Sequence, residues 1–90
     1  MKITVTQEHI DRGREQMRVA LTCRTCPVAQ ALRDAGFNDV RVYRDEIYLW
    51  THRWKSPFRS IATPPEVATW IHKFDMGHAH PFEFHLDVPS

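Results

Sequence analysis

The sequence predicts a small α+β domain, in which a mixed and mainly antiparallel sheet carries two principal helices on one face. Short stretches that alternate between apolar and polar residues recur along the chain, as expected of half-buried strands. Only two longer stretches place apolar residues at helical spacing. The length of 90 residues allows one hydrophobic core. We therefore expect a single domain over residues 1–90, with the element order β-α-α-β-β-β-α-β.

The N-terminal segment predicts a strand followed by a short helix. Apolar and polar residues alternate in Lys2–Thr6, which indicates a strand with one buried face. Thr6 can cap a helix over Gln7–Arg12, and Gly13 would end it. The stretch Arg14–Thr22 has no clean period, so we expect an irregular or partly extended connection there.

The next helix is predicted to begin at Pro27, because the fixed φ of proline suits the first helical position. Gly36 suits the left-handed residue that ends a helix. Between these two residues, the apolar positions form a stripe at helical spacing: Val28, Ala31, Leu32 and Ala35.

Three strands are predicted after this helix. Asp39–Tyr43 and Glu46–Trp50 alternate on either side of Arg44-Asp45, which indicates a hairpin. Phe58–Ala62 offers a third strand, and residues 51–57 are expected to form a loop.

The C-terminal part predicts the clearest helix and a last strand. Thr63 and Glu66 have the spacing of a capping box, with proline at the start of the helix. Apolar residues then recur with helical period before Gly77, at Val67, Trp70, Ile71 and Phe74. Phe82–Val88 alternates again and could pair with the first strand.

Composition and charge favour a folded protein with a slightly basic middle. Hydrophobic residues make up 42% and charged residues 26%, close to the globular average, and the net charge is +1. Residues 12–59 carry ten Lys and Arg against five Asp and Glu, which favours an acidic or polyanionic partner if the charges share one surface. Apolar runs are too short to cross a bilayer and no signal peptide is evident, so we expect a cytoplasmic protein.

The two cysteines, Cys23 and Cys26, allow three interpretations. Their spacing fits a redox dithiol or half of a structural zinc site, and a helix N-terminus would stabilise the thiolate of Cys26. His78 and His80 are the remaining candidate ligands, although they lack the separation of three to five residues that is standard for zinc histidines and no second cysteine pair is present. In the simplest interpretation Cys26 caps a helix, Cys23 packs nearby and both histidines lie in a solvent loop. We predict no cofactor.

The most suggestive surface mixes cations with aromatic side chains around the predicted hairpin and its loop. Tyr48, Trp50 and Trp54 are the predicted anchors, since aromatic residues and arginine dominate binding interfaces. The complete predicted partner-binding set is Arg41, Arg44, Tyr48, Trp50, Arg53, Trp54, Lys55 and Arg59. The same pattern would also arise if one face entered the core and the other carried solvated charge.

Binding is the function class that the sequence favours. Neither a nucleophile elbow nor a glycine-rich phosphate loop is present, so we expect a non-enzymatic protein. A protein partner is favoured because the net charge is close to zero. The alternative is a nucleic-acid-binding module that uses the hairpin 41–59, with cations on phosphates and aromatic rings on bases. The third alternative is a zinc module.

Four segments also carry a resemblance. They are Lys2–Thr6, Cys26–Ala29, Ala62–Ala68 and Pro81–Phe84. Their order resembles that in small, uncharacterised proteins encoded by bacteriophages and by actinobacterial and other bacterial genomes. The resemblance implies a phage or mobile-element setting and brings no catalytic residue with it. Small proteins in that setting often block host machinery, so anti-defence activity, including inhibition of CRISPR effectors, is a hypothesis from context.

Overall fold

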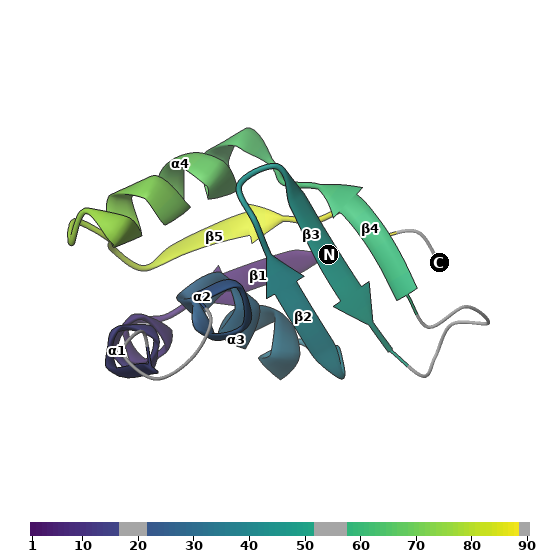
Figure 1. The fold of residues 1–90 in the computed structure, drawn as a ribbon, viewed down its shortest axis with the longest axis horizontal. Helices are drawn as coiled ribbons and strands as arrows, with labels where there is room; N and C mark the ends of the chain where they lie inside the picture. The colour runs from purple at the N-terminus through teal and green to yellow at the C-terminus, as the bar shows by residue number, and fades with distance from the viewer. Residues whose placement is uncertain (17–21, 52–57, 89–90) are drawn as a thin grey trace.

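The computed structural model describes residues 1–16, 22–51 and 58–88, and it has the predicted α+β class and order of principal elements (Figure 1). The elements are β1 (Lys2–Val5), α1 (Gln7–Gln16), α2 (Thr22–Thr25), α3 (Pro27–Asp34), β2 (Asp39–Val42), β3 (Glu46–Trp50), β4 (Phe58–Ala62), α4 (Pro65–Asp75) and β5 (Phe82–His85). None of the helices in these described ranges has the length and apolar character needed to cross a membrane.

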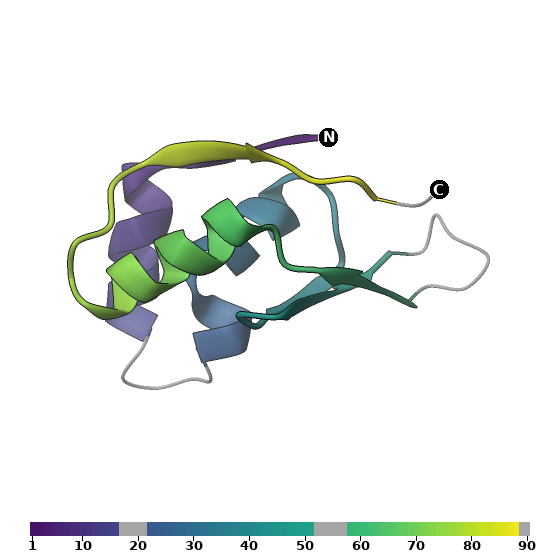
Figure 2. The ribbon, with the colours of Figure 1, turned by 90° about the horizontal axis from the view of Figure 1, so that it is seen from above.

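The described strands form two antiparallel sheets. The first and last strands pair as predicted, with Ile3 opposite Phe84, and make a two-stranded ribbon. The other strands form a three-stranded sheet in the order β2-β3-β4. Figure 2 shows the ribbon and the three-stranded sheet on opposite sides of the molecule, with α3 and α4 between them. The strands divide in this way because each sheet covers the helices with its own apolar face.

The hydrophobic core lies between the two sheets. Ile3 and Val5 enter it from the ribbon, while Ile47 and Leu49 enter it from the three-stranded sheet. A row of stacked rings joins α4 to β5: Trp70 stacks on Phe74 and on Phe82, with ring centroids 5.7 and 4.8 Å apart. Burial of such side chains is the main source of stability in a domain of this size.

Helix α1 is longer than predicted, and Gly13 does not end it. The helix continues to Gln16, and Gly13 is buried inside it. A Cβ atom at this position would lie 2.8 Å from Cδ of Pro27, so only glycine lets α1 approach α3 this closely. The sequence pattern therefore marked a close helix contact and not a helix end.

Helix α2 was not predicted, since its sequence Thr-Cys-Arg-Thr has low helix propensity. Its last carbonyl, that of Thr25, accepts a hydrogen bond of 2.7 Å from Nε2 of Gln30. A side chain from α3 thus satisfies a backbone group that the short helix leaves open.

Helix α4 is confirmed, but its predicted capping box is wrong. Pro64 occupies the N-cap position and no side chain caps the helix. The hydroxyl of Thr63 instead donates to the carbonyl of Tyr43, 2.7 Å away, and its N–H donates to the carbonyl of Asp45. Thr63 therefore ties the end of β4 to the turn between β2 and β3.

Candidate partner-binding surface

The outer face of the three-stranded sheet carries the predicted binding side chains. Side chains alternate along β2 and β3, and one set, which includes Val40, Ile47 and Leu49, is buried in the core. The other set points away from the core. It forms the hairpin hollow, a shallow depression of about 480 Å³ lined by Arg41, Tyr43, Asp45, Glu46, Tyr48 and Trp50.

Arg41 lies over Trp50 at the end of the hollow farther from the turn. The guanidinium carbon is 5.4 Å from the centroid of the Trp50 ring, within the range of a cation–π contact. Its Nε atom is buried and has no hydrogen-bond partner. Tyr48 is the direct cross-strand neighbour of Arg41. The aromatic ring, and not a hydrogen bond to Nε, therefore holds this side chain in place.

The end of the hollow near the turn combines two tyrosines with two carboxylates. The rings of Tyr43 and Tyr48 meet edge to face, with centroids 5.7 Å apart and planes at 82°. The Tyr48 hydroxyl donates a hydrogen bond of 2.5 Å to Oε2 of Glu46. This bond, followed by slight desolvation and by the charges of Glu46 and Asp45, raises the pKa of Tyr48 above its ordinary value of 10.0.

The other cations predicted for this surface lie elsewhere. Arg44 sits in the turn, and its guanidinium is 3.7 Å from the carboxylate of Asp75 on α4. Arg59 pairs with Leu49 in the register, so it belongs to the opposite face of the sheet. The remaining predicted residues, Arg53, Trp54 and Lys55, lie outside the described residues.

The structure thus brings together Arg41, Tyr48 and Trp50 from the predicted set. The predicted set did not include Asp45, which was placed in the turn of the hairpin, or Glu46, which was placed at the start of its second strand. Strand alternation contained the signal for one of them, because Glu46 shares its face with Tyr48 and Trp50.

The candidate metal ligands do not come together among the described side chains. Cys26 is buried at the N-cap position of α3, where no side chain makes a capping hydrogen bond. His78 and His80 are exposed in the segment after α4. The side chain of Cys23 is not among those described. Within the described ranges, no three His, Cys, Asp or Glu residues form a cluster that could hold a metal ion.

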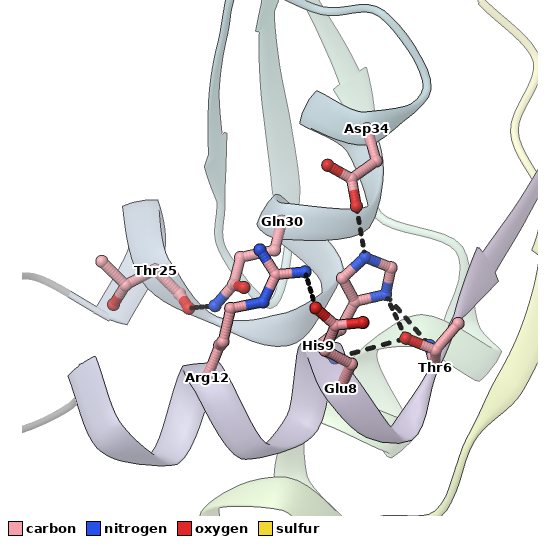
Figure 3. A network of polar contacts seen from close by, with 7 residues as sticks. All are labelled: Thr6, Glu8, His9, Arg12, Thr25, Gln30 and Asp34. Carbon is pink, nitrogen blue, oxygen red and sulfur yellow. Dashed lines mark hydrogen bonds and ion pairs between the residues drawn. The ribbon is translucent and has the colours of Figure 1, made fainter.

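A second polar cluster lies at the start of α1 and involves Thr6, His9 and Asp34 (Figure 3). The backbone N–H of Thr6 donates to Nδ1 of His9 over 3.0 Å, so Nδ1 is an acceptor and Nε2 carries the proton. That proton is donated to Oδ2 of Asp34, 2.6 Å away. In return, the N–H of His9 donates to the Thr6 hydroxyl oxygen over 3.3 Å.

This arrangement is a capping box with histidine in the place usually taken by Glu or Gln. Threonine, histidine and aspartate are also the residue types of a hydrolytic triad. Here, however, the Thr6 hydroxyl accepts the N–H of His9 in the first turn of α1, and Asp34 joins α1 to α3. Each contact in the cluster has a structural role, so we interpret the cluster as a stabilising feature of the fold and not as a catalytic site. The predicted cap at Thr6 is confirmed.

The fold and the hollow define a small α+β domain with one aromatic and charged surface on its three-stranded sheet. No family model matches the chain, and neither a curated protein nor a solved structure matches it. The function is therefore inferred from the surface itself.

Proposed function

We propose that the chain is a non-enzymatic accessory domain that binds a protein partner through the hairpin hollow. The observation that supports this proposal is the composition of the hollow. Tyr43, Tyr48 and Trp50 gather with Arg41 around a depression on the outer side of a sheet. Tyrosine, tryptophan and arginine are the side chains that contribute most to the free energy of protein association.

The charges around the hollow favour a protein over a nucleic acid. Two carboxylates, Asp45 and Glu46, line it together with the single guanidinium of Arg41. A phosphate backbone would meet these carboxylates at close range. Other cations of the basic middle segment lie beside carboxylates, since Arg24 and Arg33 both approach the single carboxylate of Asp39. Among the described residues, Arg24, Arg33 and Arg44 each lie beside a carboxylate, which weakens the positive potential that a nucleic acid would meet.

The phage setting and the anti-defence role stay predictions that rest on the resemblance. Nucleic-acid binding and a zinc module remain the alternatives, and each gives a different outcome in the experiment that follows.

The experiment compares three tagged forms of the protein in a pull-down from nuclease-treated bacterial lysate. They are the wild type, Trp50→Ala and the control Lys73→Ala, which changes an exposed residue of α4 away from the hollow. Circular dichroism first verifies that all three are folded. We expect a stoichiometric protein partner that the wild type and the control retain and that Trp50→Ala loses.

Equal retention by Trp50→Ala would remove the hollow from the interface. Recovery of nucleic acid alone, from lysate without nuclease, would support the nucleic-acid alternative. Zinc in elemental analysis and unfolding by a chelator would support the zinc module.

A further inference from the structure

The two ends of the hairpin hollow differ in charge. Arg41 and Trp50 occupy the end farther from the turn, while Asp45, Glu46 and Tyr43 occupy the end at the turn. Tyr48 lies between them. At the turn end, two carboxylates lie beside two tyrosines, and no cation lines that part of the hollow among the described residues.

We propose that the turn end of the hairpin hollow receives a lysine or arginine side chain from a basic segment of the protein partner. The inference rests on the proposed function and names the chemistry of the partner at that same surface. A cation placed there would face the rings of Tyr43 and Tyr48, which stand at 82° to each other, and would lie beside the carboxylates of Asp45 and Glu46.

The molecule already contains one contact of this kind. Arg41 rests on Trp50 at 5.4 Å, so the far end of the hollow is filled by a guanidinium of the chain itself. The turn end offers the same type of aromatic wall together with acidic groups. Cations over aromatic faces gain about 0.5–2 kcal/mol, depending on how far they are desolvated. A neighbouring carboxylate strengthens such a contact because it adds direct charge attraction.

The electrostatic potential at the turn end also agrees with a cationic occupant. The proton of Tyr48 is held more firmly than usual because it bridges to the carboxylate of Glu46, and Asp45 adds to the effect. The charges of Glu46 and Asp45, which add to the hydrogen bond and desolvation in raising the pKa of Tyr48, also attract a positively charged side chain. An acidic peptide would instead meet like charges at this end.

The test is a titration of the full chain, labelled with nitrogen-15, followed by NMR at physiological salt. The probe is a capped hexapeptide that alternates arginine and threonine, and a matched peptide carries glutamate in place of arginine. We expect saturable shifts of the amide signals of Tyr43, Glu46 and Tyr48 with the arginine peptide and none with the glutamate peptide. No shift with the arginine peptide at millimolar concentration would overturn the inference.

Two isosteric double variants separate a local contact from a general effect of charge. Asp45→Asn/Glu46→Gln removes both carboxylates of the hollow, while an amide oxygen remains to accept the Tyr48 hydroxyl. Glu66→Gln/Asp87→Asn removes two exposed carboxylates from elsewhere in the chain. We expect roughly fivefold weaker peptide binding in the first variant, equivalent to about 1 kcal/mol, and no change in the second. Equal weakening in both would reduce the effect to net charge and overturn the inference.

The same first variant, used in the lysate pull-down, distinguishes this inference from the proposed function. A partner that is lost with Trp50→Ala but kept by Asp45→Asn/Glu46→Gln would leave the hollow as an interface and disprove the cation site. A partner that is kept by both variants would disprove the two proposals together.

Discussion

The polar cluster at the start of α1 and the hairpin hollow both contain hydrogen-bonded polar side chains, but they differ in burial and in the elements that they connect. In the cluster, the side chain of His9 is 7% exposed, and both of its ring nitrogens have hydrogen-bond partners within the fold. In the hollow, Tyr43 is 41% exposed, and the bond from Tyr48 to Glu46 joins two residues of the same strand. The cluster connects elements that are distant in sequence, whereas the side-chain contacts of Arg41 with Trp50 and of Tyr48 with Tyr43 and Glu46 stay within one hairpin.

This difference indicates where stability and binding reside. Hydrogen bonds that join separate elements in a buried site are lost on unfolding and hold the fold together. Contacts within an exposed hairpin contribute little to stability and keep aromatic and charged groups at the surface. Variants in the two regions should therefore separate the two properties.

The largest expected contrast is between two tryptophans. The ring of Trp70 is 5% exposed, stacks on Phe74 and Phe82, and donates from Nε1 to the carbonyl of His80. Trp70→Ala should therefore lower the free energy of unfolding by about 3–5 kcal/mol. Trp50→Ala removes a half-buried ring of the outer face and should cost about 1 kcal/mol. Urea unfolding followed by circular dichroism measures both. Equal losses would mean that the outer face is part of the core.

The next contrast compares the cluster with the hollow directly. His9→Ala leaves the N–H of Thr6 without its acceptor and breaks the link to Asp34, so we expect a loss of about 1–3 kcal/mol. Tyr48→Phe removes one exposed hydrogen bond and should stay within about 0.5 kcal/mol of the wild type. Chemical denaturation of the two variants provides the comparison. A Tyr48→Phe loss as large as that of His9→Ala would contradict the division between the regions.

Gly13→Ala tests the packing of α1 that supports the cluster. The added methyl group would lie 2.8 and 2.9 Å from the Pro27 ring, and overpacking of this kind costs about 1–3 kcal/mol. Better helix propensity returns about 1 kcal/mol, which leaves a net loss of about 1–2 kcal/mol. Thermal unfolding measures this loss of stability. In a Pro27→Ala background, Gly13→Ala should destabilise the protein less. Stabilisation by Gly13→Ala alone would show that α1 and α3 are not in close contact.

The smallest effect concerns the ionisation of Tyr48. The pKa of Tyr48 is raised in the folded state, so the protonated hydroxyl stabilises the fold. This stabilisation is complete below pH 10.0 and is lost as the pH rises through the pKa of the folded state. Glu46→Ala removes the hydrogen-bond acceptor, which is the largest cause, and should lower the pKa of Tyr48 toward 10.0. The pKa is measured from the absorbance of ionised tyrosine in a Tyr43→Phe background, where Tyr48 is the remaining tyrosine. An unchanged titration midpoint would refute the bond to Glu46.

The sequence predicted those elements whose signals are local. Alternation located the hairpin strands and their turn, and helical spacing located α4 with its buried face. The extent of α1 could not be predicted, because the role of Gly13 depends on Pro27, which belongs to another helix. The capping box at Thr63 failed for a similar reason, since its hydroxyl bonds to Tyr43 of the preceding hairpin.

The binding surface was predicted in part, and the missing part is a matter of register. Trp50 and Tyr48 were found from residue type. The side of the sheet on which Arg59 lies can be assigned only when the register of β4 against β3 is known, and that register places Arg59 opposite Leu49. The ion pair of Arg44 with Asp75 depends on how α4 packs, and no sequence pattern indicates it.

The ribbon of β1 and β5 has a consequence for the order in which the chain folds. The N–H of Leu86 donates to the carbonyl of Met1, so the ribbon joins residues 85 positions apart, whereas β2, β3 and β4 pair through near neighbours. Closing such a long loop costs more conformational entropy and slows folding, so we expect the ribbon to form after the three-stranded sheet. We therefore expect the strands of the hairpin that holds the hollow to pair before the core closes, and the pairing of the first and last strands to be the slowest step of folding.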